Sequence, residues 1–337
     1  MRSVAILCNP HAQRATPELI AALQGSVPVE DFLLSRTLDD ARAAAQTIAD
    51  RGYDAVCVAG GDGTIAQLCT DLFALVPAGG KLPVIVPLRF GTGCALGDVC
   101  EASPPTPAGL VSDVERARRD LPTSPLHLIE VAGRLGCFTG VGLDADYADD
   151  FRRIVKQGLS RTPLARFVRG VPGLVVTAAA LTVPRLVVRP RRAMRIVNIG
   201  DPAHRLDSAG KRTGDAIPTG AVLHEGELTI AAASTIWSYA FKTRFFPFVD
   251  GLGAAFQLRM SSASGLRVLV NLPAAVKGTY SNPNVLWDYA ATGVAIELAE
   301  PAPFHVAGDV QPRAKRFEIR LASRTVPIVR PRASATN

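Results

Sequence analysis

The sequence predicts an α/β domain with a parallel sheet, followed by a β-rich domain built as an antiparallel sandwich or barrel. The chain has 337 residues, more than one small module needs. Apolar runs alternate with helical segments over the first 100 residues, and short β-like runs dominate after about residue 121. Hydrophobic residues make up 48% and charged residues 20%, which excludes a disordered chain.

The first domain, residues 1–122, is expected to alternate strand and helix. Apolar runs predict strands at 3–7, 31–34, 54–59 and 82–87. Helical spacing and composition predict helices at 17–24, 39–51 and 65–76, the second of which starts with acidic residues and precedes Gly52. Strands that alternate with helices indicate a parallel sheet, so ligands are expected at the carboxyl ends of its strands.

The second domain, residues 123–321, is expected to be rich in strands. Short β-like runs separated by Gly, Pro, Asn and Asp occur at 126–131, 186–188, 195–199, 227–232, 255–260, 266–270, 293–298 and 317–321. This pattern is typical of an antiparallel sandwich or barrel.

The cysteines argue against a secreted disulfide scaffold. All six lie in the first 137 residues, and none forms a CxxC pair, so buried free thiols are expected. The five histidines are scattered without zinc spacing, and no metal ligand is assigned among them. The N-terminus lacks a secretory signal, and no uncharged run approaches the roughly 20 apolar residues of a membrane span. We therefore expect a cytoplasmic protein.

The net charge of +7 is concentrated in one segment. Residues 151–192 hold ten Lys and Arg side chains and no Asp or Glu, interleaved with apolar residues. Cations beside an apolar run favour an anionic membrane surface, with the protein peripherally bound to its inner face. The segment carries no recognisable nucleic-acid motif, so we expect no nucleic-acid partner. The simpler alternative to membrane binding is a basic face that is only solvated.

The strongest chemical signal is Gly60-Gly61-Asp62-Gly63-Thr64, directly after the strand at 54–59. Glycines allow the backbone to approach a phosphate, and a helix N-terminus presents free N–H groups to an anion. Thr64 can cap the helix or donate to a phosphate oxygen. Asp62 is better placed to hold Mg²⁺ or to accept a proton from an attacking hydroxyl group. The alternative is a tight turn with a capping Asp.

A second glycine loop, Gly91-Thr92-Gly93, follows the next strand at 82–87. Two adjacent parallel strands that each end in a glycine loop would build one crevice for a nucleotide. Neither loop is a Walker A sequence, and neither matches the dinucleotide fingerprint.

Taken in order, these motifs resemble the diacylglycerol kinase catalytic family, which includes bacterial lipid kinases, sphingosine kinases and ceramide kinases. The resemblance covers nearly the whole chain. The similar segments are Asn9-Pro10, the two glycine loops, the run 142–146 with Asp144 and Asp146, the run 225–228, the run 306–309 that ends in Asp309, and the closing run 325–327.

The resemblance implies a nucleotide-binding domain and a lipid-substrate domain, with ATP and Mg²⁺ between them and the chain end, about 322–330, returning to the first domain. The γ-phosphoryl group would pass to a lipid hydroxyl. Family analogy makes Asp62 and Asp309 the catalytic candidates, without deciding which is the base. It assigns nucleotide contacts to Asn9, Gly60, Gly61, Gly63, Thr64, Gly91, Thr92 and Gly93, and lipid contacts to Asp144 and Asp146.

The chain departs from the family pattern at several positions. Cys94 replaces the usual Asn of the second loop, Gln67 a usual Glu, and Ala307 the Asp of the late segment, while His224 displaces an acid. These losses leave the metal ligands unknown. The run Gly93-Cys94-Ala95-Leu96, together with Asp146, favours a ceramide or sphingoid acceptor.

Three alternatives stay open. The acceptor could be diacylglycerol, the enzyme could be a soluble dinucleotide kinase, or the chain could be a non-catalytic lipid-binding relative. The segment 241–251, with four Phe residues and two cations, could line an acyl pocket or touch a bilayer, and an ordinary core element is the alternative. Pairing of two copies into a homodimer through an edge strand is also open.

Overall fold

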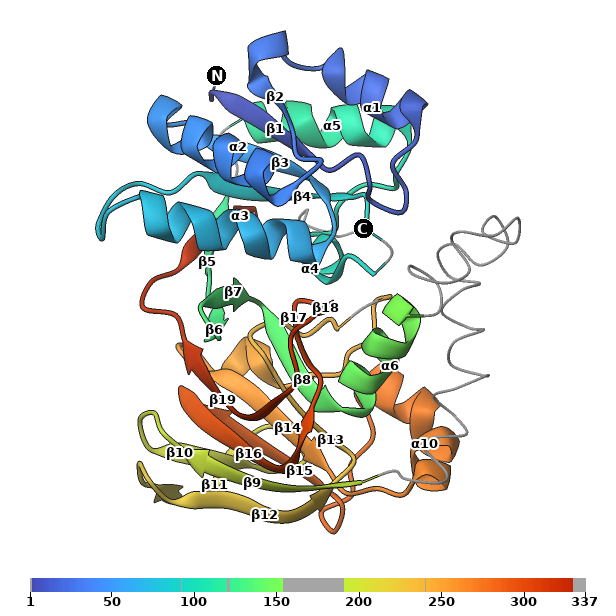
Figure 1. The fold of residues 1–337 in the computed structure, drawn as a ribbon, viewed down its shortest axis with the longest axis vertical. Helices are drawn as coiled ribbons and strands as arrows, with labels where there is room; N and C mark the ends of the chain where they lie inside the picture. Colours follow the sequence, from blue (N-terminus) through green and yellow to red (C-terminus); the bar gives the residue numbers. More distant parts are fainter. Residues whose placement is uncertain (1, 92, 120–121, 154–190, 240, 330–337) are drawn as a thin grey trace, which may run out of the picture.

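The computed structural model describes residues 2–91, 93–119, 122–153, 191–239 and 241–329. Figure 1 shows two units, one above the other, with α3 and α4 of the upper unit facing β7, β17 and β18 of the lower. The predicted fold class, an α/β domain followed by an antiparallel β-rich domain, is confirmed.

The upper unit is built on a six-stranded sheet of order β2-β1-β3-β4-β20-β5. Its strands are β1 (Val4–Cys8), β2 (Phe32–Leu34), β3 (Ala55–Gly60), β4 (Val84–Arg89), β5 (Thr123–Leu126) and β20 (Val326–Val329). β1 to β4 and β20 are parallel, and β5 pairs antiparallel with β20. β1 and β3 are buried along their whole length, as expected for the centre of a parallel sheet.

Five α-helices accompany this sheet: α1 (Pro17–Gln24), α2 (Leu38–Arg51), α3 (Asp62–Leu75), α4 (Ala95–Val99) and α5 (Pro107–Arg118). The N-cap residues Thr16, Thr37 and Thr106 each accept a backbone N–H with their side chains, which explains where α1, α2 and α5 begin. Gly52 ends α2 in the left-handed conformation that favours glycine. α3 and α4 begin at the two glycine loops.

The lower unit consists of two antiparallel sheets. One has the order β11-β10-β15-β14-β13-β8-β17-β18 and the other β12-β9-β16-β19-β6-β7. The strands are β6 (Ile129–Val131), β7 (Arg134–Gly136), β8 (Phe138–Gly142), β9 (Arg192–Asn198), β10 (Ala203–Leu206), β11 (Arg212–Ile217), β12 (Val222–Leu228), β13 (Ile230–Ser234), β14 (Phe256–Ser261), β15 (Leu286–Ala291), β16 (Gly293–Ala302), β17 (Phe304–Val306), β18 (Asp309–Val310) and β19 (Ala314–Leu321).

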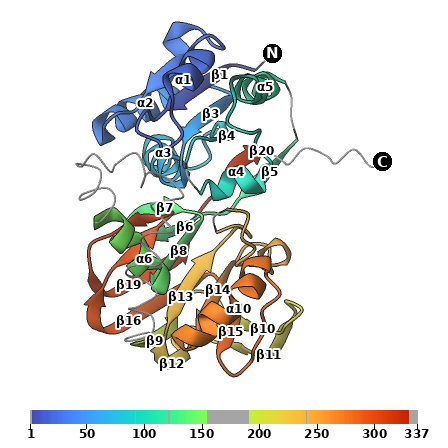
Figure 2. The ribbon, with the colours of Figure 1, turned by 90° about the vertical axis from the view of Figure 1, so that its right-hand side faces the viewer.

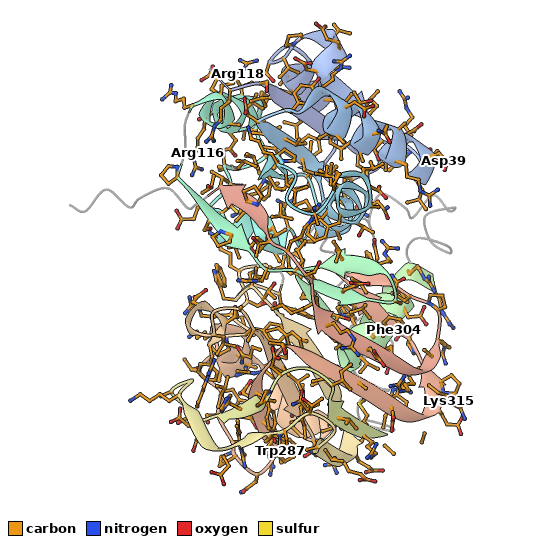
Figure 3. The ribbon with its side chains drawn as sticks, turned by 90° about the vertical axis from the view of Figure 1, so that its left-hand side faces the viewer. Asp39, Arg116, Arg118, Trp287, Phe304 and Lys315 are labelled. Atoms are coloured by element: carbon orange, nitrogen blue, oxygen red, sulfur yellow. The ribbon has the colours of Figure 1, made fainter. Side chains whose placement is uncertain are left out.

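The two sheets enclose a dry apolar core. Val141, Ile196, Leu258 and Ile296 are fully buried within it, and they come from strands of both sheets. The ring of Phe304, labelled in Figure 3, stacks on Phe317 with the ring centroids 4.4 Å apart. Such a core is typical of a β-sandwich.

Helices of the lower unit are α6 (Leu143–Phe151) and α10 (Gly265–Lys277), and a short 3₁₀ turn, η5, spans Val249–Gly251. The predicted strand at 266–270 is wrong, because these residues lie inside α10. Gly278, in the left-handed conformation, ends α10. Apolar and β-branched residues such as Val268 and Val270 are common in strands as well, so the short apolar run did not distinguish a helix from a strand. The expected strand at 186–188, and nearly all of the basic segment 151–192, lie outside the described residues.

The boundary expected at residue 122 falls just before β5, which lies in the upper sheet. β20, within the expected returning segment 322–330, joins that sheet between β4 and β5. The chain therefore crosses between the units twice, after β5 and before β20. All six cysteines are free and buried. Across the described ranges, none of the helices combines the length and apolar character that a bilayer crossing requires.

The start of α2 offers a test of local stability. Thr37 Oγ1 accepts the Asp40 N–H at 3.1 Å, and Asp40 Oδ2 accepts the Thr37 N–H at 3.0 Å, which forms a capping box. We expect Thr37→Ala to lower the free energy of unfolding by about 1 kcal/mol, measured by urea denaturation.

Thr47→Ala, in the same helix, is the matched control. Thr47 only bonds back to the Ala43 carbonyl, so we expect its loss to leave stability unchanged or slightly raised. Equal destabilisation by both substitutions would contradict the capping role of Thr37.

Candidate active site

The two predicted glycine loops are in direct backbone contact at the carboxyl ends of β3 and β4. The Gly91 N–H donates to the Gly60 carbonyl at 3.0 Å. A Cβ atom on Gly91 would lie 2.6 Å from Gly61 Cα, so only glycine fits at this position. Gly60, Gly61, Gly63, Gly91 and Gly93 therefore gather at one place, as the sequence predicted. Thr92 lies outside the described residues.

Asn9 joins this group from the end of β1. Its Nδ2 donates to Thr64 Oγ1 at 3.3 Å, and its Oδ1 accepts the His11 N–H at 2.9 Å. The structure thus brings Asn9 and Thr64 together with the glycine loops, at the edge where a parallel sheet places its ligands. Their contact with a nucleotide stays a prediction.

Asp62 is the first residue of α3, and its carboxylate turns toward the second loop. It accepts the N–H groups of Ala95 at 2.9 Å and Leu96 at 3.0 Å, at the start of α4. Burial raises the pKa of Asp62, and the two N–H groups oppose that shift. Asp62 therefore fixes α4 relative to the first loop, a role beyond the catalytic one expected from the sequence.

Asp309 meets the first loop from the other unit. It begins β18, and its carboxylate lies so close to Gly63 that a Cβ atom there would be 2.6 Å from Asp309 Oδ2. The side chain is 50% exposed, and Arg134 Nη2 lies 3.3 Å from Oδ2. Of the two catalytic candidates, Asp309 is the more exposed, since Asp62 is only partly accessible to solvent.

Asp144 belongs to a buried cluster with two residues that the sequence did not single out. The Tyr239 hydroxyl donates to Asp144 Oδ2, and His305 Nε2 lies 3.0 Å from the same oxygen. The Ala145 N–H donates to Oδ1 at 2.8 Å. Burial, followed by the charge of Asp144, raises the pKa of Tyr239 well above its ordinary range, so this phenol stays protonated. Lipid contact by Asp144 stays a prediction.

Asp146 lies two residues after Asp144 on α6 and has different surroundings. Both of its carboxylate oxygens accept from Arg192 Nη2 at 2.7 Å. The pair lines a cavity of about 300 Å³ with Asp149, Asp150, Arg153, Arg191 and Arg313. The structure therefore gives Asp144 and Asp146 different surroundings: Asp144 bonds to Tyr239 and His305, and Asp146 is paired with Arg192.

Asp98 of α4 is a further residue that sequence reasoning missed. Its carboxylate is only 1% exposed and accepts from Arg89 Nη1 at 2.6 Å. Across the units it accepts the Ser238 hydroxyl at 3.2 Å and the Lys242 N–H at 2.7 Å. The signal in the sequence was its position, four residues after Cys94 in the second loop, because its partners in the lower unit are more than 100 residues away.

The donors available for a metal are few. Among the side chains described, there is no group of three or more His, Cys, Asp or Glu residues placed to hold an ion. Mg²⁺ in kinases binds substrate phosphates and water through one or two carboxylates, so a dedicated cage is not needed. The exposed carboxylate of Asp309 fits that kind of site.

The family model of the diacylglycerol kinase catalytic domain matches residues 3–100. No curated protein matches the chain by sequence. Among solved structures, the chain is similar to a putative diacylglycerol kinase from Bacillus anthracis str. Sterne, with 15% identity, a TM-score of 0.65 and coverage of 98% of this chain and 97% of that one. A second diacylglycerol kinase structure from the same organism has 17% identity, a TM-score of 0.62 and the same coverage.

An NAD kinase from Archaeoglobus fulgidus, solved in complex with ATP, has 11% identity and a TM-score of 0.50 over 97% of this chain and 93% of that chain. At these identities the structures establish the shared fold, and the family rests on the matched residues. The glycine loops, Asp62 and the start of α4 all fall within 3–100. Residues 3–100 thus match the model of the diacylglycerol kinase catalytic domain, and this match supports the predictions of that family and of an ATP-dependent kinase.

Proposed function

We propose that this protein is an ATP-dependent lipid kinase that transfers the γ-phosphoryl group to a lipid hydroxyl at the cytoplasmic face of a membrane. The observation that carries the proposal is the meeting of the two glycine loops with Asp309 of the other unit. Phosphoryl transfer depends on positioning and charge neutralisation, so loops for the phosphates opposite an exposed carboxylate supply its essential parts.

Within this proposal, Asp309 is the base and Asp62 positions the second loop. A base must reach the proton of the acceptor hydroxyl, and the half-exposed Asp309 carboxylate can do so. Asp62 is already engaged by two backbone N–H groups. Mg²⁺, when bound with ATP, would neutralise phosphate charge.

For the acceptor, we propose a sphingolipid-type alcohol, with ceramide favoured over a free sphingoid base and diacylglycerol as the alternative. The preference for this class comes from the run 93–96, because Asp146, the other residue that favoured it, is paired with Arg192. Asp146 is neutralised by Arg192, which makes it a poor partner for the ammonium group of a sphingoid base. An uncharged acceptor therefore suits the site better.

The test is transfer of labelled phosphate from ATP and Mg²⁺ to micellar ceramide, sphingosine and diacylglycerol, with NAD as a soluble acceptor. We expect a lipid to be labelled. Asp309→Asn should lower the rate by about 10²- to 10⁴-fold, because general base catalysis contributes that much, and should leave binding of a non-hydrolysable ATP analogue intact.

Labelling of NAD alone would contradict the lipid kinase assignment and would indicate a dinucleotide kinase. ATP binding without labelling of any acceptor would favour the non-catalytic relative. Full activity of the Asp309→Asn variant would contradict the proposal that Asp309 is the general base.

The contact between the loops predicts a specific effect on nucleotide binding. The Cβ of Gly91→Ala would press on Gly61 Cα and force the loops apart, at an overpacking cost of about 1–3 kcal/mol. We expect the affinity for the ATP analogue, measured by calorimetry, to fall roughly 5- to 150-fold. Gly251→Ala is the control, since its Cβ would meet no atom within 4 Å; equal losses in both variants would contradict the loop contact.

The membrane-facing part of the proposal draws on α10 and the turn at 241–242. Val270 is 71% exposed, Leu272 49% and Phe241 48%, which are high values for large apolar side chains. α10 also carries Arg267 and Lys277 and no acidic residue. Apolar side chains beside cations favour an anionic bilayer surface.

Val270→Ser should therefore weaken sedimentation with vesicles that contain anionic phospholipid by roughly three- to tenfold, the loss expected for one partly buried valine. Val29 is 88% exposed but lies on the other unit, so Val29→Ser is the matched control and should change nothing. Equal vesicle binding by wild type and Val270→Ser would exclude α10 from the membrane contact.

A further inference from the structure

The contacts around the site form a closed ring that passes through both units. Asp62 joins the first glycine loop to the start of α4, and Asp98, further along α4, joins it to Ser238 and Lys242 of the lower unit. From there the ring continues through Tyr239, Asp144 and His305, and it returns through Asp309 to Gly63.

Residues 238–239 and 241–242 are the part of the ring that connects the nucleotide loops with the acceptor side. The turn is closed by the Tyr239 N–H, which donates to the Thr243 carbonyl at 3.2 Å. Phe241 and Lys242 both have positive φ, 51° and 57°, a conformation that costs non-glycine residues energy. Backbone N–H groups of these two residues donate to the Gly93 carbonyl, at 3.4 Å, and to Asp98. The strained turn is thus held against the second loop by its own amides.

On its other side, the turn reaches the hairpin that carries Asp309. His305 is 3% exposed, and its Nδ1 accepts the Gly308 N–H at 3.4 Å. Its Nε2 lies 3.0 Å from Asp144 Oδ2 and 2.6 Å from the Tyr239 hydroxyl oxygen. The imidazole of His305 therefore connects Gly308, the residue before Asp309, with Asp144 and Tyr239.

We propose that Asp98 and Tyr239 are positioning residues that hold the second glycine loop and the Asp309 hairpin in one geometry. Both act through other groups: Asp98 through the strained turn, and Tyr239 through Asp144 and His305. The inference rests on the proposed function for its catalytic consequence, since the geometry matters for transfer between a nucleotide and an acceptor.

The first test is hydrogen exchange of the ligand-free protein. Asp98→Asn keeps the size of the side chain but removes an acceptor for the Lys242 N–H and the Ser238 hydroxyl. We expect amides of residues 304–311 to exchange several-fold faster in this variant, although Asp98 does not touch them, while β14 keeps its protection. Asp113→Asn is the control, because Asp113 is a buried carboxylate that bonds to Ser103 of the upper unit.

The second test is kinetic. We expect Tyr239→Phe to lower kcat about tenfold with KM for ATP unchanged, because its hydroxyl contacts the acceptor-side cluster and not the glycine loops. Tyr289→Phe removes a buried tyrosine hydroxyl that bonds only to the Leu223 carbonyl, and its kcat should match that of the wild type. The double variant with Asp98→Asn should be no slower than the slower single variant, since both interrupt one path.

Unchanged exchange at 304–311 in Asp98→Asn would overturn the proposal, and so would full additivity of the two kinetic effects. The exchange experiment needs no substrate. If the wild type phosphorylated no lipid, the proposed function would fail while the exchange result would still decide whether the ring couples the two units.

Discussion

The close approach of Gly91 to Gly61 is the constraint on which the site depends. Parallel pairing of β3 with β4 brings the ends of the two strands together, and the absence of side chains lets their loops touch backbone to backbone. A second close approach, Asp309 against Gly63, then adds the other unit. Glycine is needed at position 91 because the backbone of the first loop lies where a Cβ atom would be.

Buried carboxylates join distant segments at the site, beside an apolar core of the upper unit that also includes Leu135 and Phe138 of the lower unit. Asp62, Asp98 and Asp144 each accept hydrogen bonds from segments distant in the sequence. A buried carboxylate is costly without partners, so each of these side chains requires its neighbours to stay in place. The same requirement that specifies the geometry makes it sensitive to the loss of a single donor or acceptor.

The sequence predicted most of the upper unit well, because alternating apolar strands and capped helices are local signals. The helix at 17–24 begins and ends as expected, and the glycine loops lie where the motif placed them. Local signals failed at 266–270, where Leu and Val suit a strand as well as a helix and the tertiary context decided for a helix. The strands at 203–206 and 212–217 were missed because polar residues interrupt them.

The residues of the site also fall into those that local sequence signals predicted and those that only the tertiary structure revealed. The sequence alone identified Asn9, the glycine loops, Asp62 and Asp309, because these residues stand in recognisable motifs. Only the tertiary structure showed that Asp98 bonds to Lys242, that Tyr239 and His305 share Asp144, and that Asp146 is neutralised by Arg192. A motif records residues adjacent in the chain. The partners of a buried carboxylate are fixed by sheet pairing and by the packing of the units, which join residues as far apart as Asp146 and Arg192 or Asp98 and Lys242.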